Sequence, residues 1–251
     1  DQMTYELEAF GDAVVRDIHI AEQALMRTES REEAMRSLRD LIEQAQDNPD
    51  FFRYIETTYM RAMDTLGRHL DIVDACIQDN PNYYKKSIAL HTLMTMRNYG
   101  LSDHQKDATT LLHRHVPTAD ALLNSDFLPY AEFLELIFSY GAEQDQHRWH
   151  EKINTLLEGD EYKKFLGRHA IESLFKSHDA LTRTHGNALA INQLNKYGLH
   201  GKAARDTILA WRVSDEKKRV PGRISDNIGV ISKLEEQEPG CVDRLSQEFG
   251  I

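Results

Sequence analysis

Cysteine is nearly absent from this sequence, with only Cys76 and Cys241 among its 251 residues. Two cysteines this far apart form neither a disulfide framework nor a cysteine-based zinc motif. We interpret them as small buried or half-buried thiols. This usage suits a reducing compartment.

Proline and glycine are also scarce, at 6 and 13 residues. A chain with many strands needs many turns, and turns draw on these two residue types. Apolar residues instead recur every three or four positions, as at Val14, Ile18, Ala21 and Leu25, which is the spacing of one helix face. The sequence therefore predicts an all-α fold, an array of antiparallel helix pairs that is either α-solenoid-like or an irregular helical bundle.

Long hydrophobic runs are missing as well. No run approaches the roughly 20 apolar residues that cross a bilayer, and no basic leader with an apolar core opens the chain. We therefore expect no membrane partner and a cytoplasmic location. Because the chain begins at Asp1 rather than Met, we expect a fragment of a larger intracellular protein.

The sequence does contain a repeated seven-residue motif. Asp47–Arg53 recurs as Asp79–Lys85, 32 residues later. Asn before Pro favours a helix start, because Asn can cap the first turn and Pro has no N–H to leave unpaired there. We expect helices to begin at Asn48-Pro49 and Asn80-Pro81, with a break near Gly67, since interior glycine disfavours a helix. The motif predicts a helix-pair unit that is used at least twice.

A second repeated signal, Tyr-Gly, marks expected helix ends at Tyr99-Gly100, Tyr140-Gly141 and Tyr197-Gly198. Glycine after a helix often adopts the left-handed conformation that closes it. Ser102 with Gln105, and Ser30 with Glu33, have the spacing of capping boxes. These signals place the expected helix boundaries.

The most apolar segment is Asp126–Tyr140, which we expect to form a buried, central helix with Phe133 and Phe138 in the core. The predicted organisation is a helical-pair array over residues 1–213, a linker over 214–225 and short C-terminal helices over 226–251 that pack on the array.

This pattern resembles α-solenoids of helix–turn–helix repeats, the tetratricopeptide and pentatricopeptide classes, over Asn48 to Val213. The small-residue positions of the tetratricopeptide motif are not satisfied: counting from Asp50, Thr57 stands where Gly is expected and His69 where Ala is expected. The resemblance implies a scaffold that binds peptides, proteins or RNA along a curved surface.

Charge is unevenly distributed along the chain, which has 30 basic and 41 acidic residues in all. Residues 163–223 contain 13 basic and 5 acidic residues, so a basic block adjoins an acidic body. One hypothesis is a surface that binds nucleic acid or phosphate anions, with Tyr197 or Trp211 as stacking platforms. Alternatively, the basic side chains pair with acids of neighbouring helices or of an acidic protein partner. The candidate contacts are Lys202, Arg205, Arg212, Lys217, Lys218, Arg219 and Arg223.

Histidine is abundant, with 12 residues. His147 and His150 are three positions apart and share a helix face. Together with His178-Asp179, and Asp206 or Asp215 further on, they resemble the His, His-Asp, Asp order of HD-type metal-dependent phosphohydrolases. The resemblance implies a divalent metal, held by His147, His150, His178 and Asp179, that activates water. No Walker phosphate loop, nucleophile elbow or His-Glu-x-x-His motif occurs.

The function we predict from sequence is a non-catalytic helical scaffold or protein-interaction module, with no cofactor and a protein partner. Nucleic-acid or phosphate-anion binding through residues 163–223 and HD-type hydrolysis are the alternatives. The sequence fixes neither the oligomeric state nor the partner.

Overall fold

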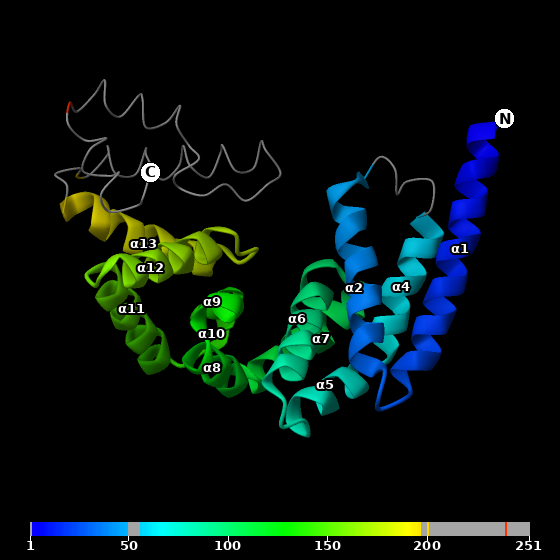
Figure 1. Cartoon of the computed structure of the whole chain (residues 1–251), viewed down its shortest axis with the longest axis horizontal. Helices are drawn as coiled ribbons and strands as arrows, with labels where there is room; N and C mark the ends of the chain where they lie inside the picture. Colours follow the sequence, from blue (N-terminus) through cyan, green and yellow to red (C-terminus); the bar gives the residue numbers. More distant parts are fainter. Residues whose placement is uncertain (1, 50–55, 197–199, 201–238, 240–251) are drawn as a thin grey trace. The chain divides into compact units, whose positions relative to one another are not determined.

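The computed structural model describes residues 2–49, 56–196, 200 and 239 (Figure 1). All regular secondary structure in these ranges is helical, and no strand occurs in them. The predicted all-α fold is therefore confirmed. None of the described helices combines the length and the apolar character needed to cross a membrane. The predicted linker at 214–225 and, except for Pro239, the C-terminal helices at 226–251 lie outside the described residues.

By its contacts the chain divides into two compact units, Asp1–Thr118 and Ala119–Ile251, called here unit 1 and unit 2. The described helices of unit 1 are α1 (Gln2–Leu25), α2 (Arg31–Asp47), α4 (Glu56–Arg68), α5 (Leu70–Gln78), α6 (Tyr83–Tyr99) and α7 (Ser102–Arg114). Their core is apolar, and the side chains that are at most 1% exposed include Leu25, Met35, Leu38, Ile42, Leu66, Ile77, Leu90 and Leu93.

Helix α8 (Val116–Ser125) leads from unit 1 into unit 2 and has Pro117 in its first turn, where proline is tolerated. It is followed by α9 (Phe127–Tyr130), the 3-10 helix η2 (Ala131–Phe133), α10 (Leu134–Tyr140), α11 (Glu143–Leu157), α12 (Glu161–Phe175) and α13 (Ala180–Lys196). Close approach of these helices depends on glycine, because a Cβ at Gly167 would lie 2.8 Å from the Leu157 side chain and one at Gly186 would lie 2.9 Å from Leu174 Cβ.

The apolar segment Asp126–Tyr140 is buried as predicted, with Phe133 and Phe138 at 1% and 0% exposure. The expectation that it forms one helix is wrong, because the segment is split into α9, η2 and α10. Pro129 lies in the first turn of α9, where its missing N–H costs no hydrogen bond, and the first break follows at Tyr130-Ala131. Leu128, next to it, remains 38% exposed.

The predicted breaks near Gly67 and Gly100 are confirmed, since α4 gives way to α5 at His69 and α6 to α7 at Gly100-Leu101. The predicted start at Asn80-Pro81 is displaced by two residues. Asn82 is the N-cap of α6, and its side chain accepts a hydrogen bond from the Lys85 N–H at 3.1 Å. In the first copy of the motif, Asn48 is the C-cap of α2 and Pro49 is helical, so a helix begins at Asn48-Pro49 as predicted, and residues 50–55 after it lie outside the described residues.

Both predicted capping boxes are wrong, although the helices begin close to where they were expected. Ser30 precedes α2, but its hydroxyl donates to the Ala24 carbonyl at 2.9 Å instead of capping α2. Leu101, not Ser102, is the N-cap of α7, and the Gln105 side chain donates backward to the Asn98 carbonyl at 3.2 Å. In both cases the polar side chain joins two helices across the turn.

The left-handed caps predicted at Gly100 and Gly141 are also wrong. Gly100 is extended (φ −66°, ψ 169°) and is followed by Leu101 at φ −63°, ψ 152°. Gly141 (φ −71°, ψ 158°) and Ala142 (φ −63°, ψ 151°) have nearly the same geometry. Glycine is needed for space, because a Cβ at either site would overlap the carbonyl oxygen four residues earlier. Tyr197-Gly198 lies outside the described residues.

Candidate functional site

The candidate basic contacts, Lys202, Arg205, Arg212, Lys217, Lys218, Arg219 and Arg223, all lie outside the described residues. The structure describes the first part of the basic block, residues 163–196, and some of its basic side chains form ion pairs with acids. Lys196 Nζ lies 2.9 Å from Glu158 Oε1, and Lys164 Nζ lies 3.7 Å from Glu161 Oε1. The Lys196–Glu158 pair matches the alternative in which basic residues pair with acids of neighbouring helices, whereas Lys164 and Glu161 belong to the same helix, α12.

The histidines and the aspartate of the proposed metal set have separate roles. His147 is exposed and pairs with Glu151, with Nε2 to Oε1 at 3.2 Å. Asp179 caps α13, where its Oδ1 accepts from the Leu181 N–H at 2.7 Å and the Thr182 N–H at 3.1 Å. Among the described residues, no three His, Cys, Asp or Glu side chains converge as metal ligands would.

His150 instead lines an open hollow of about 810 Å³ in unit 2, together with His147 and His185. The His185 ring stacks on Phe138 at 4.7 Å between centroids, and the buried His150 Nε2 has no protein hydrogen-bond partner. Burial lowers the pKa of both His150 and His185, and the charge of a neighbouring histidine lowers each further. Sequence reasoning missed His185, because only the packing of α13 brings it to a site that begins with α11.

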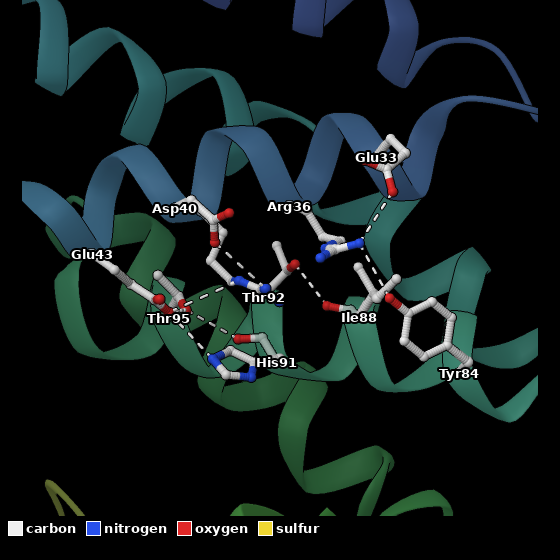
Figure 2. Close-up of polar contacts among 10 residues, drawn as sticks. Glu33, Arg36, Asp40, Glu43, Tyr84, Ile88, His91, Thr92 and Thr95 are labelled. Atoms are coloured by element: carbon white, nitrogen blue, oxygen red, sulfur yellow. Dashed lines mark hydrogen bonds and ion pairs between the residues drawn. The ribbon is translucent and has the colours of Figure 1, made fainter. Parts of the chain in front are cut away.

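The seam between α2 and α6 carries the polar cluster drawn in Figure 2. Arg36 Nη1 donates to the Tyr84 hydroxyl at 3.1 Å, and His91 Nε2 lies 3.2 Å from Glu43 Oε1. Both pairs are 48 positions apart in sequence, and a constant offset means that the two helices run in the same direction (Figure 2). Parallel neighbours of this kind are expected where successive hairpins stack side by side.

Glu43 is the centre of that seam and accepts a second hydrogen bond, from the Thr95 hydroxyl at 2.9 Å. Partial burial raises its pKa, but the hydrogen bonds from His91 and Thr95 and the charges of His91 and Arg39 outweigh burial and leave the pKa lowered. The carboxylate is thus held ionised by the neighbours that join the helices. This cluster has a structural role in unit 1.

Other carboxylates are used in the same way. Asp74 Oδ1 lies 2.5 Å from Nε2 of His115, whose side chain is 5% exposed. In unit 2, Asp120 Oδ1 accepts from Trp149 Nε1 at 2.6 Å and from Arg148 Nη2 at 3.0 Å. These groups pin one helix to another, and none forms a pair of catalytic carboxylates facing a hollow.

A further feature of unit 1 is a largely apolar hollow of about 420 Å³ between α1 and α2, called here the α1–α2 groove. Its lining residues are Val14, Asp17, Ile18, Ile20, Ala21 and Ala24 on α1, Ser30 before α2, and Glu33, Ala34, Ser37, Leu38 and Leu41 on α2. Val14, Ile18 and Leu38 are buried. Ile20 is 62% exposed, so an apolar side chain of the groove meets solvent. The apolar stripe in the sequence of α1 predicted that one face of this helix lies in the core. It did not predict that apolar residues beside this face remain exposed to solvent.

The sequence matches no protein-family model, and no curated protein and no solved structure matches it.

Proposed function

We propose that this chain is a non-catalytic helical module that binds another protein. The observation that carries the proposal is the α1–α2 groove of unit 1. Its lining is largely apolar, and one of its apolar side chains, Ile20, is 62% exposed. Exposed apolar surface that is rimmed by polar residues is typical of protein-interaction sites. The rim here consists of Asp17, Glu33 and Ser37.

The carboxylates at the described helix contacts agree with this proposal. The carboxylates of Glu43, Asp74, Asp120 and Asp179 are each bonded to side chains or N–H groups that hold helices in place. A general acid or base needs a carboxylate or imidazole that faces a substrate site at hydrogen-bond distance. Groups that hold the fold together are poorly placed for that role.

The experiment is affinity capture from a nuclease-treated extract of the source organism, with the intact chain as bait. Ile20→Ser removes an exposed apolar side chain of the groove, and Asp12→Lys changes an exposed residue of α1 that does not line it. We expect a polypeptide that the wild type and Asp12→Lys retain and Ile20→Ser loses, and that re-forms a complex of fixed stoichiometry when both components are purified. If no polypeptide does so, or if retention requires nucleic acid, the proposal is wrong.

A further inference from the structure

We infer that the α1–α2 groove binds an amphipathic helix of a partner protein, with basic residues flanking the apolar stripe of that helix. This inference rests on the proposed function and names the partner's chemistry. Three properties of the groove carry it: its length and shape, the size of its lining residues, and its charge.

The groove has the dimensions of a helix-binding site. On α1 it extends from Val14 to Ala24 and on α2 from Ser30 to Leu41. At 1.5 Å rise per residue each wall is about 15 Å long, or roughly three turns. A bound helix of that length presents apolar residues at i, i+3 or i+4, and i+7. An extended peptide would lack an exposed sheet edge to pair with, since the described residues form no strand.

Small side chains allow close approach. Ala24 on α1 and Ser37 on α2 line the accessible part of the groove, whereas Ala21 and Ala34 are already buried, at 7% and 4% exposure. Alanine and serine extend little beyond Cβ, so a third helix can pack near the short end of the usual interaxial range, about 8–10 Å. The flank of α2 that faces α6 is different, because there Arg36 and Glu43 bridge the helices with long polar side chains.

The charge of the groove selects a basic partner. Asp17 lies on the α1 wall and Glu33, which also pairs with Arg36 at 3.2 Å, lies on the α2 wall, and both are exposed. Residues 2–47, which include both helices, contain 11 acidic and 5 basic residues. Acids on both walls favour lysine or arginine on both sides of the partner's apolar stripe, which raises the association rate and excludes acidic helices.

The test uses three fluorescein-labelled 18-residue peptides and the intact chain, followed by fluorescence anisotropy. The first peptide has a leucine stripe at helical spacing flanked by lysine. The second has the same stripe flanked by glutamate. The third has the composition of the first in scrambled order, so that no stripe forms. We expect binding of the first alone, with an affinity that falls as salt concentration rises.

Three variants locate the binding site. Asp17→Lys reverses the charge of one wall, and Asp12→Lys makes the same change on an exposed position of α1 outside the groove. Ile20→Ser removes an exposed apolar side chain without disturbing the core. We expect Asp17→Lys and Ile20→Ser each to weaken binding of the lysine-flanked peptide about tenfold, and Asp12→Lys to leave it within about twofold. Far-UV circular dichroism of each variant should match the wild type.

Several results overturn the inference. Binding of the scrambled peptide as tight as that of the amphipathic one means non-specific charge attraction, and equal effects of Asp12→Lys and Asp17→Lys mean the same. Sedimentation that shows self-association abolished by Ile20→Ser means that a second copy of this chain occupies the groove. If extract capture yields a partner that Ile20→Ser loses while the lysine-flanked peptide does not compete for it, the interaction function stands and only the partner chemistry inferred here fails.

Discussion

Gly67→Ala tests how closely α4 and α7 pack in unit 1. Gly67 lies inside α4, and a Cβ at this position would overlap the imidazole ring of His104 on α7. The Nδ1 atom of that ring is buried without a protein hydrogen-bond partner. The ring therefore occupies the space that an ordinary residue in α4 would fill with its side chain.

Two opposing terms set the magnitude. Replacing glycine with alanine inside a helix stabilises it by about 0.5–1 kcal/mol, whereas inserting an atom into a packed interface costs about 1–3 kcal/mol. We therefore expect Gly67→Ala to lower the free energy of unfolding by about 1 kcal/mol. In a His104→Ala background the overlap is gone, and the same change should raise the free energy of unfolding by about 0.5–1 kcal/mol.

The assay is urea unfolding of the wild type, Gly67→Ala, His104→Ala and the double variant, followed by far-UV circular dichroism. Both tryptophans, Trp149 and Trp211, belong to unit 2, so tryptophan fluorescence would not report on this contact. Hydrogen exchange of peptides from α4 and α7 gives a local readout of the same change. If Gly67→Ala changes stability by the same amount with and without His104, the two residues are not coupled and the packing described here is refuted.

Three further predictions concern other buried groups. Asp120→Ala should lower the free energy of unfolding of unit 2 by about 1–3 kcal/mol, because the indole N–H of the 3%-exposed Trp149 loses its acceptor. The control, Asp145→Ala, removes the other carboxylate on Arg148 and should lower the free energy of unfolding by less than about 1 kcal/mol. Trp149 fluorescence during urea unfolding, in a Trp211→Phe background, measures both changes. His150 and His185 have pKa values below 6.5 in the folded state, so the unfolded chain binds more protons and stability should fall as pH drops from about 6.5; the melting temperature should decrease from pH 7.5 to 5.5 by less in a His150→Gln/His185→Gln variant than in the wild type. The Cys76 thiol is 4% exposed, and its burial, together with the nearby Glu32 charge, raises its pKa to about 11. In a Cys241→Ser variant, Cys76 should therefore react with a disulfide reagent only after denaturation. Fast reaction of the native protein would contradict its burial.

The helix boundaries of this protein can be predicted from sequence to within a few residues, but the contacts that close the helices cannot. Gly100 stops α6 where it was expected to, yet it does so in an extended conformation. A glycine is compatible with either geometry, and the choice depends on how α7 packs against α6 after the turn. Ser30 has an acid, Glu33, at the right spacing for a capping box, but its hydroxyl donates a hydrogen bond to the Ala24 carbonyl across the turn instead. Local motifs indicate where a turn lies, whereas tertiary contacts decide which hydrogen bonds are made in it.

The candidate site is harder to predict for the same reason. His147 and His150 are neighbours on one helix face, which suggested shared metal ligation, but His147 pairs with Glu151, and both histidines line a hollow that also includes His185. The pairing of α2 and α6 at an offset of 48 positions could likewise not be predicted from the sequence, in which the repeated seven-residue motif has a spacing of 32. Such pairings depend on side chains that meet only after the chain has folded.

The two flanks of α2 show what distinguishes a completed helix contact from an open one. Toward α6, the contact includes bonded pairs such as Arg36 with Tyr84 and Glu43 with His91, in which long side chains find specific partners. Toward the α1–α2 groove, the flank consists of Ala34, Ser37 and Leu41, with Glu33 at the edge. Short apolar side chains gain little free energy from facing water but a good deal from contact with another apolar surface. Ala34 and Leu38 are themselves buried, at 4% and 1% exposure, so the open part of this flank is limited to Ser37, Glu33 and the half-buried Leu41.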